Sequence, residues 1–155
     1  MNITPSQNNH DKCVYCSIPE IKARCIISNE LAWAFPTNIP ITKGHTLVSP
    51  IRCVRTLQEL SQEERLAILD LADTIMTALK NIYGSDGFNC VWNEGKFAGQ
   101  SVPHFHLHII QRKDGDTGLY GYDPRSMLYR TGDREPTEES ELLKVRDEIR
   151  RQCEK

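Results

Sequence analysis

The chain has 155 residues, of which 39% are hydrophobic, and its 19 lysines and arginines against 21 aspartates and glutamates give a formal net charge of −2. This length suits one domain with a sizeable core, and the charge balance excludes a generally basic nucleic-acid-binding protein. No run of about 18 apolar residues and no charged-then-apolar leader is present, so we expect a cytoplasmic protein without nucleic-acid or membrane partners.

The first half of the chain predicts three strands. Residues 1–11 are polar and typical of a flexible tail. Two apolar runs over 24–28 and 31–35 are separated by an Asn-Glu pair and predict a β-hairpin, and residues 45–49 predict a third strand that a proline ends.

A long helix and two further strands follow. Ser61 and Glu64 have the spacing of a capping box, and apolar residues recur at helical spacing from there to Gly84. Alternating or apolar segments over 87–93 and 104–111 predict a fourth and a fifth strand.

The C-terminal part carries a weaker pattern. A glycine-containing loop precedes a predicted helix from Thr137, which has acidic residues in its first turn and arginines near its end, as the helix dipole favours. Its few apolar positions could pack on the sheet or on a partner subunit. We therefore divide the chain into a tail (1–11), a main domain (12–113) and a loop-and-helix extension (114–155), with an α+β fold and an antiparallel sheet.

Three of the five histidines stand in the run His104-Phe105-His106-Leu107-His108. Strict alternation is the pattern of a half-buried strand, so the histidines should share one face while the apolar residues enter the core. A row of imidazoles can be solvated, bind a metal or an anion, or present a nucleophile.

The segment before this row, Asn93-Glu94-Gly95-Lys96-Phe97-Ala98-Gly99-Gln100-Ser101-Val102, resembles that of the histidine triad (HIT) superfamily of nucleotide hydrolases and transferases. The upstream segment Lys43-Gly44-His45-Thr46-Leu47-Val48-Ser49-Pro50 is similar to the family pattern G-H-x-L-V-x-P. The resemblance spans roughly residues 13–113, the HIT domain, and implies a five-stranded antiparallel sheet with one long central helix, commonly paired in a homodimer. The C-terminal helix completes the expected fold.

The resemblance implies that His106 is the nucleophile. It would attack the α-phosphate of a nucleotide and form a nucleotidyl-histidine that water or another acceptor cleaves. Phosphate-binding or catalytic roles beside it fall to Asn93, Gly99, Gln100, Ser101 and His108, and amide, hydroxyl and imidazole groups can all donate hydrogen bonds. His45 would support the triad from a neighbouring strand.

The resemblance also implies a nucleoside pocket. The base would lie against Val14, Tyr15, Ile18 and Phe35, and the sugar hydroxyls near Thr37 and Asn38. Relatives usually have aspartate or asparagine in place of Thr37, so ribose affinity and base preference are expected to differ. The apolar members of this set also fit a core position.

Cys13 and Cys16 form a C-x-x-C pair, which is compatible with a metal site, a redox couple or free thiols. Some family members hold zinc with such a pair, a downstream histidine and the first triad histidine. Here Cys53 takes the place of the downstream histidine, and zinc accepts thiolate readily. We therefore expect one structural zinc ion per chain, bound by Cys13, Cys16, Cys53 and His104.

Two substrate classes remain open at this stage. Dinucleoside polyphosphates have a long anionic leaving group, for which Lys43, Lys96, Arg112 and Lys113 could supply charge, whereas nucleoside phosphoramidates release a small amine. A non-catalytic protein that binds or senses nucleotides is the alternative, and a purely metal-binding module is a third possibility.

Overall fold

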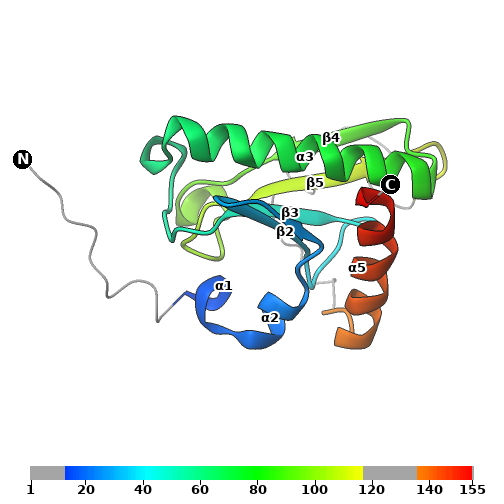
Figure 1. Cartoon of the computed structure of the whole chain (residues 1–155), viewed down its shortest axis with the longest axis horizontal. Helices are drawn as coiled ribbons and strands as arrows, with labels where there is room; N and C mark the ends of the chain where they lie inside the picture. Colours follow the sequence, from blue (N-terminus) through cyan, green and yellow to red (C-terminus); the bar gives the residue numbers. More distant parts are fainter. Residues whose placement is uncertain (1–12, 117–135, 155) are drawn as a thin grey trace, which may run out of the picture.

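The computed structural model describes residues 13–116 and 136–154. Its centre is a five-stranded antiparallel sheet in the order β1-β2-β3-β5-β4 (Figure 1). The strands are β1 (Ile27–Ser28), β2 (Ala32–Pro36), β3 (Thr46–Pro50), β4 (Gly87–Val91) and β5 (Leu107–Arg112). The expected α+β fold is therefore confirmed, while the expected tail and most of the loop after residue 116 lie outside the described residues.

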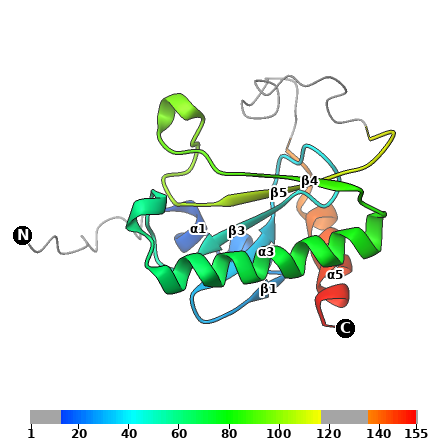
Figure 2. The same cartoon turned by 90° about the horizontal axis from the view of Figure 1, so that it is seen from above.

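One long helix, α3 (Gln62–Tyr83), crosses a face of the sheet (Figure 2). Its start is the predicted capping box: Ser61 Oγ accepts from the Glu64 amide at 3.1 Å, and the Glu64 carboxylate accepts from the Ser61 amide at 2.8 Å. Gly84 ends the helix in the left-handed conformation (φ 64°). Both ends match the prediction because both depend on local contacts.

The N-terminal segment differs from the prediction. It forms two short helices, α1 (Val14–Ser17) and α2 (Pro19–Ala23), so the first strand starts only at Ile27 and not at residue 24. Pro19 stands at the first position of α2, where its fixed φ favours a helix. Two single-turn 3-10 helices, η2 (Leu57–Glu59) and η3 (Lys96–Ala98), lie in the loops before α3 and before β5.

The histidine run is only partly in a strand. β5 begins at Leu107, because the amide of Phe105 donates to the carbonyl of Val54 and that of His104 to the carbonyl of Val102, outside the sheet ladder. The predicted alternation nevertheless holds. Phe105, Leu107 and Ile109 belong to the core beneath α3, as the pattern requires.

The opposite face of the sheet carries a second, smaller cluster. It consists of Cys13, Tyr15 and Cys16 from the α1 region together with Phe35 of β2 and Leu47 of β3. α1 and α2 lie on this side, away from α3 (Figure 1). The histidine face of the sheet is therefore covered by the N-terminal helices.

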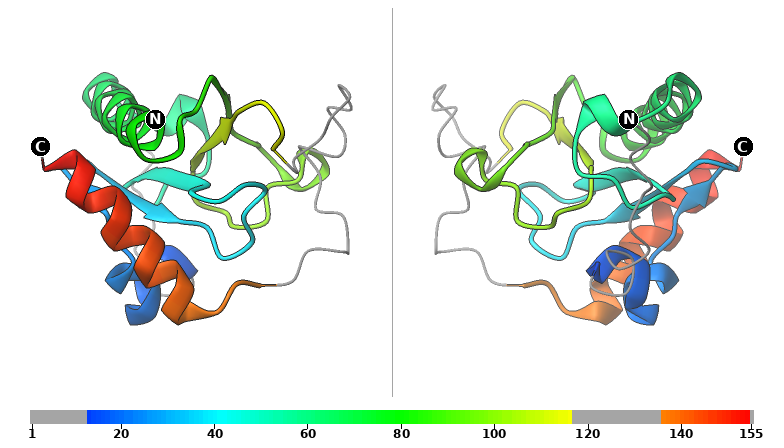
Figure 3. Two further views of the ribbon diagram at one scale, coloured as in Figure 1. Left: turned by 90° about the vertical axis from the view of Figure 1, so that its right-hand side faces the viewer. Right: turned by 90° about the vertical axis from the view of Figure 1, so that its left-hand side faces the viewer.

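The C-terminal helix, α5 (Glu139–Cys153), starts close to the predicted residue and packs on the chain's own core. Val145 and Ile149 are buried in the core cluster that α3 covers, and α5 contacts both α3 and β2. It runs obliquely from the level of α2 to the end of α3 (Figure 3). No helix within the described residues has the length and hydrophobicity needed to cross a membrane.

Candidate active site and metal cluster

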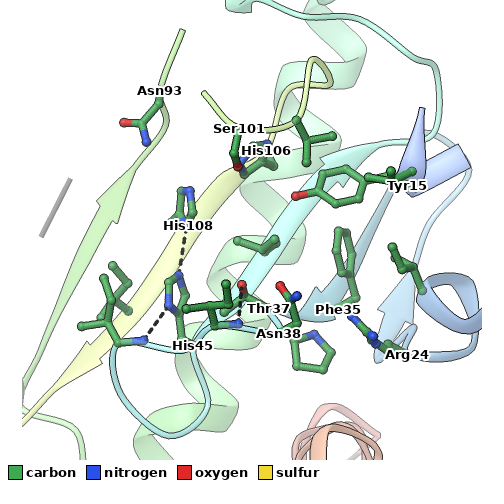
Figure 4. Close-up of a pocket in the computed structure, with 18 of the residues that line it drawn as sticks. Tyr15, Arg24, Phe35, Thr37, Asn38, His45, Asn93, Ser101, His106 and His108 are labelled. Carbon is green, nitrogen blue, oxygen red and sulfur yellow. Dashed lines mark hydrogen bonds between the residues drawn. The ribbon is translucent and has the colours of Figure 1, made fainter. Parts of the chain in front are cut away.

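A cavity of about 470 Å³ opens on the histidine face of the sheet (Figure 4). Its walls come from α1 and α2, from the loop after β2, from the end of β4 and from β5 with the loop before it. The cavity brings together eleven of the residues that the sequence suggested: Val14, Tyr15, Ile18, Phe35, Thr37, Asn38, Asn93, Gly99, Ser101, His106 and His108.

The hydrogen bonds of His106 determine which nitrogen carries its proton. Nδ1 lies 2.8 Å from the carbonyl oxygen of His104, and a carbonyl only accepts, so Nδ1 donates and the lone pair of the neutral ring is on Nε2. The side chain is only 5% exposed, and burial lowers its pKa below the usual 6.5, an effect that the His104 carbonyl partly offsets. The ring is therefore neutral near pH 7 and presents a nucleophilic nitrogen at the cavity.

A second chain of hydrogen bonds orients His108. The amide of Ile41 donates to Nδ1 of His45 at 3.1 Å, so in the uncharged ring of His45 the proton is on Nε2. This Nε2 lies 2.9 Å from Nδ1 of His108 and donates to it, which places the proton of a neutral His108 on its own Nε2 (Figure 4). His106 thus offers an acceptor nitrogen and His108 a donor nitrogen, with ring centroids 4.9 Å apart.

His104 turns away from this pair. Its Nε2 donates to the carbonyl of Pro50 at 2.9 Å, and its Nδ1 faces the sulfur atoms of Cys13 at 3.2 Å and Cys16 at 3.5 Å. Cys53 completes a cluster whose four ligand atoms all lie within 4.8 Å of one another. A tetrahedral zinc site with Zn–S of about 2.3 Å and Zn–N of about 2.0 Å has ligand–ligand edges of roughly 3.5–3.8 Å, so this donor set fits a metal ion.

The hydrogen bond that His104 makes outside the cluster is of a kind found at metal sites. Metal-binding histidines commonly donate their other ring N–H to a backbone carbonyl, as His104 does to Pro50. In the absence of a cation, burial and the neighbouring Cys13 raise the pKa of the Cys53 thiol to about 11, and burial also raises that of Cys16. A cation would favour the thiolates, because it supplies the opposite charge that the buried sulfurs lack.

Gln100 is not among the residues that line the cavity. Its side-chain oxygen accepts from the amide of Gly95 at 2.8 Å, and its side-chain nitrogen donates to the carbonyl of Arg55 at 2.9 Å. The side chain thus binds the backbone of its own loop at Gly95 and links that loop to the segment before η2 at Arg55. Gly99 has φ 86°, a conformation that favours glycine.

Arg24 lines the cavity although the sequence did not suggest it. Its Nε donates to the Glu139 carboxylate of α5 at 2.9 Å, and Nη2 also pairs with that carboxylate. The amide of Thr137 donates to the carbonyl of Asn38 at 2.7 Å. The C-terminal segment therefore holds two parts of the cavity wall, at Arg24 and Asn38, through contacts over 99 residues or more that leave no local sequence signal.

Comparison with known proteins finds similar sequences and similar folds. The HIT domain family model matches residues 18–115. An uncharacterised HIT-like protein of Mycoplasma genitalium is 38% identical over 76% of this chain and 84% of its own length. The bis(5′-adenosyl)-triphosphatase of Dictyostelium discoideum is 30% identical over 83% of this chain and 85% of its own length.

Two further proteins bear on the activity and on the metal cluster. An adenosine 5′-monophosphoramidase of Schizosaccharomyces pombe is 34% identical over 69% of this chain and 79% of that protein. A crystal structure of a Zn-bound histidine triad family protein from Mycobacterium smegmatis superimposes with a TM-score of 0.64 at 28% identity, covering 88% of this chain and 92% of the other.

Proposed function

The chain belongs to the HIT domain family, which includes nucleotide hydrolases, and on that premise we propose that it cleaves nucleotides at the α-phosphate with His106 as the nucleophile. The observation that carries this proposal is the 2.8 Å hydrogen bond from Nδ1 of His106 to the His104 carbonyl, which leaves the lone pair on Nε2 in the cavity. A non-catalytic nucleotide-binding protein would not need this tautomer.

The proposed reaction has two steps. Nε2 of His106 forms a bond to the α-phosphorus while the bond from phosphorus to the leaving group breaks, and the bonding electrons depart with that group. The His104 carbonyl stabilises the positive charge that develops on the ring, because it accepts from Nδ1–H. Water then attacks the phosphorus, a nucleoside monophosphate leaves with one water proton released, and Nε2 regains its lone pair.

Hydrogen-bond donors beside His106 suit the charge on the phosphate oxygens. Nε2–H of His108, the Ser101 hydroxyl and the Asn93 amide belong to residues that line the same cavity. We assign Gln100 an indirect part, since it fixes the loop that carries Gly99 and Ser101.

The nucleoside is proposed to occupy the other end of the cavity. Phe35 offers a rigid aromatic wall, because it stacks on Trp33 with centroids 4.0 Å apart, and Val14 and Ile18 extend that wall. Thr37 and Asn38 lie where the sugar hydroxyls are expected.

We favour a substrate with a small leaving group, such as a nucleoside phosphoramidate. None of Lys43, Lys96, Arg112 and Lys113 lines the cavity, and among the described residues the only lysine or arginine that does is Arg24, which is already paired with Glu139. A long polyphosphate would therefore find little positive charge there. An amine leaving group needs a proton, and Nε2–H of His108 can donate one.

The test compares the wild-type protein with His106→Ala on adenosine 5′-phosphoramidate and on diadenosine tetraphosphate. We expect release of AMP by the wild type, faster from the phosphoramidate, and loss of release in the variant. We also expect a nucleotidyl adduct on the wild type by intact-protein mass spectrometry after a denaturing quench at alkaline pH, because the phosphorus–nitrogen bond is labile in acid. Lys80→Ala, an exposed position on α3, serves as the control. Unchanged AMP release by His106→Ala would contradict the proposal.

We further propose that Cys13, Cys16, Cys53 and His104 hold one structural zinc ion, which would tie α1 to the triad segment. We expect one zinc per chain in protein purified without chelators, and loss of zinc with a lower melting temperature for Cys53→Ala. Cys90→Ala, which changes an exposed cysteine outside the cluster, should keep the zinc. Substoichiometric zinc in the wild type and an unchanged melting temperature for Cys53→Ala would contradict it.

A homodimer is proposed on the same family basis. β4 is an edge strand of the sheet, and the segment that follows it exposes Trp92 (43%) and Phe97 (96%). Light scattering should give twice the mass of one chain. The mass of a single chain at micromolar concentration would contradict this.

A further inference from the structure

Tyr15 is held rigidly beside the nucleophile. Its ring meets Phe35 with centroids 5.1 Å apart at 71°, and it meets His106 with centroids 5.5 Å apart at 87°, so both contacts are T-shaped. A third contact joins it to His104, 5.7 Å away. The residue is only 9% exposed and packs against all three rings.

Two cysteines of the metal cluster flank this residue in the sequence. Cys13 precedes it by two positions and Cys16 follows it directly, and both side chains are buried. The turn between them is closed by a hydrogen bond from the Cys16 amide to the Cys13 carbonyl at 3.0 Å. The backbone that carries Tyr15 is therefore fixed on both sides.

The hydroxyl of Tyr15 makes no hydrogen bond with another described residue, although nine-tenths of the side chain is buried. It points into the cavity, toward Ser101 and His106 (Figure 4). A phenol with its usual pKa of about 10 keeps its proton at neutral pH, so the hydroxyl can act as a donor. The hydroxyl oxygen is accessible at the cavity, where water or an oxygen of a bound ligand can be its hydrogen-bond partner.

We propose that the Tyr15 hydroxyl donates a hydrogen bond to a non-bridging oxygen of the α-phosphate while Nε2 of His106 attacks the phosphorus. This inference rests on the proposed function. Reacting atoms approach to about 3–3.5 Å before reaction, so a phosphorus held at Nε2 brings its oxygens beside the ring of His106, which Tyr15 faces. In this proposal Tyr15, which the family pattern places against the base, contacts the α-phosphate through its hydroxyl.

Tyr15→Phe removes only the hydroxyl and tests this role. We expect kcat to fall about 10- to 100-fold with a smaller change in KM, because the hydrogen bond strengthens as charge develops on the phosphate oxygens. Tyr83→Phe is the matched control, since that hydroxyl donates to Glu148 at 2.9 Å, outside the cavity lining, and should leave kcat unchanged. Equal kcat in wild type and Tyr15→Phe would overturn the proposal.

Rates with a substrate that carries sulfur in place of a phosphate oxygen give a second test. If Tyr15 had only a structural role, Tyr15→Phe would not change the effect of sulfur on the rate. Sulfur accepts hydrogen bonds poorly, so replacing the oxygen that Tyr15 contacts should slow the wild type with one phosphorothioate diastereomer. The same diastereomer should slow Tyr15→Phe much less. An identical effect of sulfur in both proteins, for both diastereomers, would contradict the contact.

Binding separates this inference from the proposed function. By calorimetry, Tyr15→Phe should weaken binding of AMP about 10-fold or more, because a hydrogen bond to a charged group is lost, and leave binding of adenosine unchanged. Equal weakening for both ligands, or for neither, would overturn the inference. If the wild type binds AMP but releases no product, the proposed function is overturned. The comparison of AMP and adenosine binding still tests whether the Tyr15 hydroxyl contacts the phosphate.

Discussion

His45→Phe tests whether a hydrogen-bond relay determines the protonation of the triad. The ring of His45 is 3% exposed, accepts from the Ile41 amide at 3.1 Å and donates to Nδ1 of His108 at 2.9 Å. Phenylalanine retains a ring of similar size and removes both hydrogen bonds. The variant therefore changes the polar contacts more than the packing.

The expected loss of stability follows from these two contacts. Each hydrogen bond contributes about 0.5–1.5 kcal/mol net, so we expect the free energy of unfolding to fall by about 1–3 kcal/mol. For a chain of this size each kcal/mol lowers the melting temperature by roughly 2–4 °C. The protein should still fold, since α3 and the core beneath it are untouched.

Activity should fall more than this change in stability would suggest. Without the donor from His45, the proton of His108 is free to move to Nδ1, and the fraction of His108 with a donor at Nε2 declines. We expect kcat to fall about 10-fold or more, as is common when a partner that fixes a histidine tautomer is removed. His45→Gln, whose amide can still donate toward His108, should retain part of the activity.

The assay pairs steady-state kinetics with nitrogen NMR of the histidine rings at a pH where they are neutral. We expect wild-type His108 to carry its proton on Nε2 and the variant to show a mixture of tautomers. Unchanged kcat together with an unchanged His108 tautomer in His45→Phe would refute the reasoning.

Three further predictions follow from single features. Gly44→Ala should cost about 2–5 kcal/mol, because Gly44 has φ +84° and a Cβ there would lie 2.6 Å from an aromatic carbon of α3, whereas Gly84→Ala, with nothing within 4 Å, should show only the backbone strain. Equal thermal shifts would contradict the steric account. Because burial lowers the pKa of His106, the acidic limb of the kcat/KM profile that reports its protonation should lie below pH 6.5. Stability should fall as the pH drops from 6.5 toward the lower native pKa, since the unfolded chain binds this proton first, and His106→Ala should flatten that slope. Glu139→Gln should raise KM with little effect on kcat and cost under about 1 kcal/mol, because the carboxylate that orients Arg24 at the cavity is partly exposed. An unchanged KM would indicate that the position of Arg24 at the cavity does not affect substrate binding.

Local contacts explain what could be predicted along the chain. Ser61, Glu64 and Gly84 define the ends of α3 through hydrogen bonds and a backbone conformation that involve only near neighbours. The alternation around His106 predicted which side chains face the core, and this stayed correct where the strand itself proved shorter. Pro19 is a local signal that the sequence analysis did not use, since it stands at the first position of α2.

In the candidate site, too, some features follow from local sequence and others depend on contacts between distant parts of the chain. The sequence by itself determined the family, the α+β fold and the set of histidines and cysteines that come together. This was possible because motif spacing and side-chain alternation involve residues that are close together in the sequence. The tertiary structure decided which histidine nitrogens carry protons and that Glu139 holds Arg24 at the cavity. It also decided that Gln100 lies outside the cavity lining and braces the loop that carries Gly99 and Ser101. Each of these depends on groups brought together by chain topology, 63 residues apart for His45 and His108 and 115 for Arg24 and Glu139, and no local pattern encodes such a contact.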